Sequence, residues 1–125
     1  MEKEYAILVG VTTFPDIESA KKTARHLVHN KFVACAQIST SPVNSFYMWD
    51  DKEVESPEFV LTLKFAKSRR HKVKSELVRL HPYECPQWYV FEPSEVSKKY
   101  AQWVVAQSEA VKELKVRTRV TGRGS

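Results

Sequence analysis

The sequence predicts an α+β fold, the ferredoxin-like split βαβ sandwich, with the element order βαββαβα and a long central hairpin. Three observations support this prediction. A nearly continuous apolar run close to the N-terminus is typical of a central strand that is buried on both faces. Two stretches with apolar residues at helical spacing each lie between strand-like stretches. Between these two helical stretches, two extended segments are joined by a short acidic turn, which indicates a hairpin.

The first strand and helix are predicted from residues 5–29. Residues 5–12 are apolar and rich in β-branched side chains, which favour a strand. Asp16 suits a helix N-cap, because its carboxylate can accept a hydrogen bond from a free backbone N–H group. Apolar residues then recur at helical spacing from Ile17 to Val28. The pattern predicts a helix over about residues 16–29.

The central hairpin is predicted from two long extended arms. The first arm covers residues 32–39 and continues over 44–49, with a Ser-Thr-Ser-Pro segment between them that is typical of a bulge. Residues 50–52 form the turn. Pro57 is expected to precede the strand of the second arm, in which apolar and polar residues alternate over 59–65.

A second helix follows the hairpin. Ser68 suits its N-cap, and Val73 and Leu77 are spaced to share one apolar face. The helix is expected to stop at His81, because a residue that precedes a proline is disfavoured in the helical region.

The end of the chain predicts a fourth strand over residues 86–91 and a third helix that starts at Ser97. The apolar side of this helix contains Tyr100, Trp103, Val104 and Val111. We assign residues 1–111 to one domain. Residues 112–125 alternate apolar and basic side chains, which indicates either an added edge strand or a frayed basic tail.

Composition excludes several classes of function. The net charge of +5 is concentrated in residues 112–125, which have five basic residues and one acidic residue. The body of the chain is nearly neutral, so we expect no nucleic-acid partner. No apolar run approaches the roughly 20 residues of a membrane span. The first residues do not resemble a signal peptide, and two cysteines are no disulfide framework, so we expect a cytoplasmic protein.

Enzymatic motifs are also absent from the sequence. The chain has three glycines, two of them among its last four residues, so neither glycine-rich phosphate loop is possible. No serine lies in a recognisable nucleophile turn. We therefore expect a protein without catalytic activity.

The densest group of possible ligands lies just after the second helix. His81, Glu84 and Cys85 fall within five residues, and imidazole and thiolate groups suit copper or zinc. Cys35 is the candidate that completes this set. A structural role is equally open for each residue, with His81 at the carbonyl end of the helix and a cysteine as a buried apolar side chain. Lys64, at a polar position of its strand, either meets an anionic ligand or lies at the surface.

An aromatic patch, formed by Tyr47, Met48 and Trp49, precedes the hairpin turn. Two readings are open. The patch is buried against another subunit, or it covers the core of its own chain.

Several segments resemble the CutA divalent-cation-tolerance family. Residues 32–36, Phe-Val-Ala-Cys-Ala, resemble the start of that family's second strand. Residues 45–52, Ser-Phe-Tyr-Met-Trp-Asp-Asp-Lys, are similar to its hairpin motif, and residues 81–86, His-Pro-Tyr-Glu-Cys-Pro, to its His-Pro-Tyr-Glu-Val-Pro signature. Residues 100–104 are similar to its closing helix. Order and spacing agree over about residues 5–107.

The resemblance implies a ferredoxin-like homotrimer in which the hairpin of each subunit extends into the sheet of its neighbour. The family is linked to tolerance of divalent cations and to copper binding, has no accepted enzymatic activity, and is similar to the PII signalling proteins. The resemblance also places a set of recurrent positions near the clefts between subunits. These are Cys35, Tyr47, Trp49, Lys64, His81, Tyr83 and Glu84.

The sequence departs from the family pattern at four positions. Asp51 replaces the usual glycine of the hairpin turn, and Met48 replaces the first of two tryptophans. Cys85 replaces a usual valine and adds a soft ligand. Thr12 stands where some members have a cysteine, so a metal role that depends on that cysteine is not expected here.

We therefore expect a non-enzymatic homotrimer that binds divalent metal ions, copper foremost, and no organic cofactor. The expected metal ligands are His81, Glu84, Cys35 and Cys85. The expected ligand cleft is formed by Tyr47, Trp49, Lys64 and Tyr83. Two alternatives stay open, a PII-like sensor that binds a small anionic metabolite between subunits and a trimeric scaffold.

Overall fold

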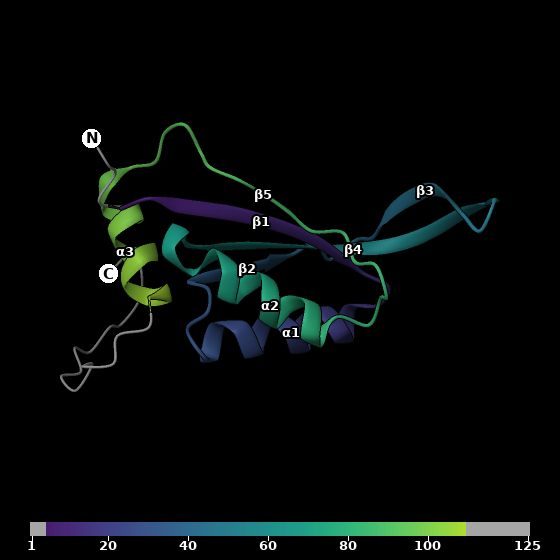
Figure 1. Cartoon of the computed structure of the whole chain (residues 1–125), viewed down its shortest axis with the longest axis horizontal. Coiled ribbons are helices and arrows are strands. Elements are labelled where there is room, and N and C mark those ends of the chain that lie inside the picture. Colours follow the sequence, from purple (N-terminus) through teal and green to yellow (C-terminus); the bar gives the residue numbers. More distant parts are fainter. Residues whose placement is uncertain (1–4, 110–125) are drawn as a thin grey trace.

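The structure of the chain is a computed structural model, which describes residues 5–109. Its elements are β1 (Ile7–Phe14), α1 (Ile17–His29), β2 (Cys35–Ile38), β3 (Val43–Trp49), β4 (Lys52–Ala66), the 3-10 helix η1 (Lys67–Arg69), α2 (Arg70–Leu80), β5 (Tyr89–Phe91) and α3 (Lys98–Ser108) (Figure 1). The predicted tail or edge strand over residues 112–125 lies outside the described residues, as does Val111.

The strands form one antiparallel arrangement in the order β2-β4-β1-β5. The register of β1 against β4 runs from Ile7 opposite Ala66 to Phe14 opposite Phe59. The remaining strand, β3, pairs with the outer half of β4 only. This strand order, with helices connecting its halves, confirms the predicted ferredoxin-like sandwich.

The two faces of the sheet differ in their cover (Figure 1). Helices α1 and α2 pack on one face, where the main core forms between them and alternate residues of the strands such as Phe14, Leu63 and Phe65. On the other face, α3 covers only the end remote from the hairpin, where Ala101 and Val104 pack on Ile7. The remainder of that face is half-buried, with valines and threonines at its surface: Val9, Val11, Val60 and Thr62.

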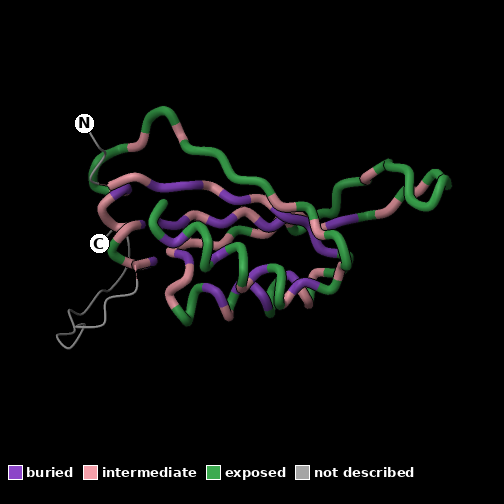
Figure 2. The backbone as a smooth tube through the Cα atoms, in the orientation of Figure 1, coloured by how far each residue is buried: buried purple, intermediate pink, exposed green. Residues whose placement is uncertain are grey.

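The hairpin of β3 and β4 projects beyond the body of the domain, and most of it is exposed (Figure 2). Strand β4 runs through 15 residues without interruption, so Pro57 lies inside it and does not precede a new strand as predicted. A proline is tolerated there because the outer half of β4 pairs only with β3 and keeps one open edge. The first arm is interrupted at the predicted Ser-Thr-Ser-Pro segment, residues 39–42. Between β2 and β3, Ser39 accepts the N–H of Val60 on its side-chain oxygen and donates its own N–H to the Val60 carbonyl, both at 2.9 Å.

The hairpin turn consists of Asp50 and Asp51, both with positive φ, at 55° and 62°. Two residues with positive φ between paired strands are typical of a type I′ turn, whose twist matches that of the strands. Aspartate tolerates this conformation better than most residues, which explains how the turn forms without the glycine usual in the family.

Helix boundaries follow the predictions at three of four tested ends. Asp16 caps α1, accepting the Ser19 N–H at 2.7 Å. Helix α2 ends before His81, whose backbone is extended. The prediction for Ser68 is wrong, because residues 67–69 form η1 and the Ser68 hydroxyl donates to Glu109 instead of capping α2. Helix α3 does begin after Ser97.

Two predicted strands are shorter in the structure. Strand β2 begins at Cys35, because the N–H groups of Phe32 and Val33 donate to the Leu27 carbonyl at the end of α1. The last strand begins at Tyr89, and Trp88, which precedes it, packs on the core. None of the helices within residues 5–109 has the length and apolar character needed to cross a membrane.

Helices α1 and α2 are joined by a partly buried ionic cluster. The Glu76 carboxylate accepts hydrogen bonds from Arg79, at 2.6 Å and 3.1 Å, and contacts His26 Nε2. The hydrogen bonds from Arg79, together with that from His26, lower the pKa of Glu76 from 4.5 to about 2. The carboxylate form is therefore favoured in the folded protein.

We expect the Glu76→Gln variant to be less stable than the unmodified chain at pH 7, and the difference to disappear in acid. A carboxyl with a lowered pKa stabilises the fold above its ordinary pKa of 4.5, and this contribution is lost as the pH falls toward about 2. Urea denaturation at a series of pH values between 7 and 2 measures it. The exposed Glu95→Gln variant is the control. A difference that is independent of pH would contradict the assignment.

Candidate functional site

A groove of about 780 Å³ lies where the hairpin leaves the body of the domain. Its sides come from β3, from the outer half of β4, and from the loop between α2 and β5. The lining residues used below are Ser45, Tyr47, Trp49, Glu58, Tyr83, Glu84 and Cys85. Side chains alternate between the two faces of a strand, so Ser45, Tyr47 and Trp49 lie on the same face of the hairpin.

The floor of the groove holds a buried carboxylate. Glu58 is only 6% exposed, and its two oxygens accept hydrogen bonds from different hydroxyls. The Ser45 hydroxyl donates to Oε1 at 2.7 Å, and the Tyr83 hydroxyl donates to Oε2 at 2.8 Å. Burial and the hydrogen bond to Glu58 raise the pKa of Tyr83 well above its ordinary value. The phenol therefore remains a neutral donor at physiological pH.

His81 holds the loop against the body of the domain. Its ring stacks on Phe14, with 4.3 Å between the ring centroids. Nε2 donates to the Thr13 carbonyl at 2.8 Å, and Nδ1 accepts the Tyr83 N–H at 3.1 Å. Burial lowers the pKa of His81, which keeps the ring neutral. Since both nitrogens are hydrogen-bonded within the chain, His81 has no lone pair for a metal in this arrangement, and it positions Tyr83.

The structure brings five of the predicted site residues together. Tyr47, Trp49, Tyr83, Glu84 and Cys85 all line the groove. Glu84 and Cys85 are exposed, and Cys85 is a free thiol. Three of the four residues of the predicted ligand cleft and two of the four predicted metal ligands are therefore neighbours.

Cys35 and Lys64 are not part of this groove. Cys35 lies opposite Lys64 on the incompletely covered face of the sheet, whereas Phe14 and the His81 ring that stacks on it lie on the helix-covered face. Cys35 pairs with Lys64, and Lys64 pairs with Val9 on the next strand. Val9 lies roughly 16 Å along β1 from Phe14, so Cys35 is also far from His81 in the strand direction. Within one chain Cys35 therefore lies apart from His81, so a metal site that combines the two would have to take them from different copies.

Lys64 has partners of its own. Its ammonium donates to the Gln37 side chain at 2.9 Å and lies 5.9 Å from the centre of the Tyr100 ring. It stands apart from Tyr47, Trp49 and Tyr83, with which it was grouped in the predicted cleft.

A match to a known family covers most of the chain. The family model described as CutA1 divalent ion tolerance protein matches residues 8–107. The chain belongs to the CutA1 family. The resemblance noted in the sequence, and the PII-like character it implied for the fold, are thereby confirmed.

Individual relatives also match over most of this chain. The divalent-cation tolerance protein CutA of Pyrococcus horikoshii is 29% identical over 103 residues, which are 82% of this chain and 99% of that protein. The protein of the same name from Thermococcus kodakarensis is 31% identical over 97 residues, 78% and 91% of the two chains. CutA1 from Ehrlichia chaffeensis has a solved structure that superposes with a TM-score of 0.81 at 28% identity and covers 86% of this chain and 100% of that one. The PII-like protein CutA from Nostoc sp. PCC 7120 superposes with a TM-score of 0.76 at 28% identity, with coverage of 82% and 97%.

The name of the CutA1 family raises the question of whether these residues fit a metal ion. Within residues 5–109, no three His, Cys, Asp or Glu side chains lie close enough together to hold one. Glu84 and Cys85 provide one carboxylate and one thiol in the groove. The donors that residues 5–109 bring together are thus soft enough for copper but too few to complete a site.

Glu58 and Ser45 are functional candidates that the sequence analysis missed. A glutamate after a proline in an extended arm reads as a solvent-exposed residue. Only the register of β3 against β4, which places Val43 opposite Glu58, brings this carboxylate beside Ser45 and over the Tyr83 loop. The one sequence signal for the burial of Glu58 is that it directly precedes the apolar stretch of residues 59–65.

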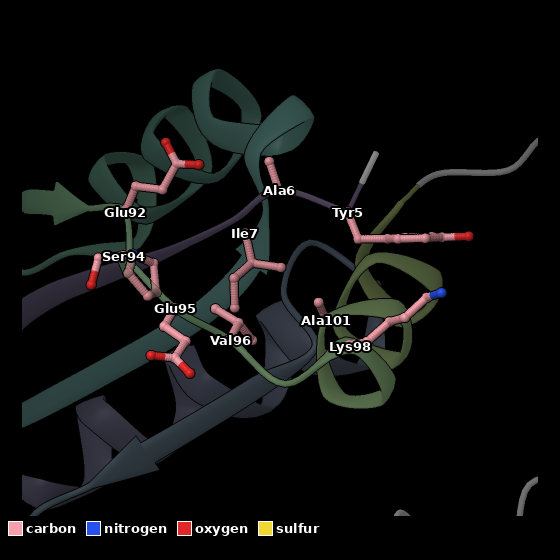
Figure 3. A pocket seen from close by; sticks show the side chains of 10 residues that line it. Tyr5, Ala6, Ile7, Glu92, Ser94, Glu95, Val96, Lys98 and Ala101 are labelled. Atoms are coloured by element: carbon pink, nitrogen blue, oxygen red, sulfur yellow. The ribbon is translucent and has the colours of Figure 1, made fainter. Parts of the chain in front are cut away.

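A second hollow, of about 380 Å³, lies at the opposite end of the domain between the start of β1 and the segment before α3 (Figure 3). Glu92, Glu95 and Lys98 bring charges of both signs to its rim, and no His or Cys lines it. Glu92 accepts a hydrogen bond from Lys67 at 3.1 Å. This hollow offers weaker chemistry for a metal than the groove does.

Proposed function

We propose that this member of the CutA1 family is a non-enzymatic binder of divalent metal ions, copper foremost, that acts as a homotrimer in metal tolerance. The observation that carries the proposal is the pair formed by Glu84 and Cys85. Both side chains are exposed and line one groove, and the loop that bears them is held at its start by the hydrogen bonds of His81. Thiolate and carboxylate together suit copper better than a hard cation.

Assembly is supported by the exposed apolar surface. Phe46 and Met48 are each 63% exposed and Trp49 is 50% exposed, all on the projecting hairpin. The half-covered face of the sheet adds further valines. Large apolar side chains exposed together on one projecting element favour an interface, and a neighbouring copy would supply the ligands that one chain lacks.

The groove is less suited to the anionic metabolite of the PII-like alternative. It carries the Glu58 carboxylate, while Lys64, one expected counter-charge, binds Gln37 elsewhere. The tail arginines, the other expected counter-charges, lie outside the described residues. Charge in the groove therefore favours a cation over an anion.

Native mass spectrometry of the reduced protein under anaerobic conditions, with and without copper or zinc, tests this proposal. We expect a species at three times the 14.5 kDa chain mass that takes up copper in a fixed ratio. The Cys85→Ser variant should bind copper at least tenfold more weakly, whereas the matched variant Cys35→Ser should leave copper uptake through Glu84 and Cys85 in place. Equal affinity in the Cys85→Ser protein would overturn the ligand assignment, and a monomer would overturn the assembly.

A further inference from the structure

The Glu58 carboxylate lacks a counter-charge. Its two hydrogen-bond donors, Ser45 and Tyr83, are neutral hydroxyls. The ion pairs found between side chains of residues 5–109 involve Glu76 and Glu92, and none involves Glu58. A buried carboxylate is costly to keep charged unless a cation or further donors compensate it. A positive charge bound in the groove next to the Glu58 carboxylate would offset this cost.

The hydrogen bonds already made by Glu58 restrict the kind of cation. A carboxylate has about four lone-pair sites, and one on each oxygen is used. The remaining capacity, one acceptor site per oxygen, fits two parallel N–H donors. A guanidinium group presents such a pair in a fixed plane, whereas a metal ion would need additional ligands at this point.

The walls of the groove suit the same group. Tyr47 and Tyr83 line the groove near Glu58, whereas Trp49 lines it four residues farther along β3 than Ser45. Tyr47 is 41% exposed, so the face of its ring is accessible. Aromatic faces attract a weakly hydrated planar cation through cation–π contact and stacking, but they give a metal ion no ligand.

We infer that the groove binds a guanidinium group, held by the Glu58 carboxylate and stacked against the aromatic side chain of Tyr47. The group has two possible sources, a free guanidino compound or an arginine side chain of a second copy of the chain. This inference goes beyond the proposed copper binding, because it rests on Glu58 and the aromatic walls and not on Glu84 and Cys85.

Calorimetric titration of the full-length, metal-free protein with arginine amide tests the inference in the presence of a chelator. Citrulline amide, a neutral analogue of similar shape, is the control ligand. We expect arginine amide to bind at least tenfold more tightly than citrulline amide. Glu58→Gln should weaken this binding at least tenfold, and Glu55→Gln, which removes the same charge from an exposed position of β4 outside the groove, is the matched control. Tyr47→Leu changes an exposed side chain and should also weaken the binding, so it tests the aromatic wall even if Glu58→Gln fails to fold.

The oligomeric mass of the same variants distinguishes the two possible sources of the guanidinium group. If the guanidinium belongs to a second copy, arginine amide should compete with assembly, and Glu58→Gln should dissociate at a protein concentration at least tenfold higher than Glu55→Gln does. If the source is a free compound, the variants keep one mass and differ in affinity alone. Either result supports the inference. Equal binding of the two amides, or a Glu58→Gln variant that is unchanged in both affinity and mass, would overturn it. Because no metal is present, neither outcome depends on the copper proposal.

Discussion

Replacing Phe14 by alanine is expected to lower the free energy of unfolding by about 3–5 kcal/mol, the range typical of a large side chain deleted from a core. Phe14 is fully buried at the end of β1, in the cluster that joins both helices to the sheet. Its ring also supports His81, which orders the Tyr83 loop. The substitution should therefore loosen the groove as well as the core.

Urea denaturation at one fixed protein concentration measures the loss in Phe14→Ala, since the stability of an oligomer depends on its concentration. Lys22→Ala, at an exposed position of α1, is the control and should change stability by no more than about 0.5 kcal/mol. A loss for Phe14→Ala as small as that of the control would contradict the packing described for β1.

Gly10→Ala is expected to destabilise the protein by about 1–3 kcal/mol, the usual cost of added volume in a packed core. The backbone of Gly10 needs no special conformation, but a Cβ atom there would lie 2.4 Å from Cη2 and 2.8 Å from Cζ3 of Trp88. The indole cannot move away freely, because it stacks on Phe65 with 6.4 Å between the ring centroids.

A double-mutant cycle isolates this clash. In a Trp88→Leu background the ring is gone, so Gly10→Ala should cost much less than in the unmodified chain. Thermal or urea denaturation of the four proteins gives the coupling. An identical penalty in both backgrounds would show that Trp88 is not the obstacle.

The fold was predictable because local patterns decide it. Apolar periodicity located α1 and α2, the Asp16 cap fixed one boundary, and the His81-Pro82 step fixed another. The errors arose where pairing overrides local preference. Pro57 signals the start of a strand in isolation, yet it sits within β4 because the adjacent edge is open.

The groove was predictable only where its residues are close in sequence. Tyr83, Glu84 and Cys85 are consecutive, so their proximity needed no fold. The separation of Cys35 from His81 within one chain could not be predicted, because the face of the sheet on which a residue lies depends on strand register, which is not evident from the sequence. Glu58 was missed for the same reason, since its burial results from the pairing of β3 with β4.

The single uninterrupted strand β4 has a consequence for how this molecule meets a partner. Its inner half is fixed between β1 and β2, and its outer half is one arm of the hairpin. The direction of the arm is thus determined when the domain folds, before any encounter. Association then requires little further ordering of the backbone, so the entropic cost that a loose arm would incur on binding is largely avoided. A partner therefore meets a hairpin arm whose direction is already fixed.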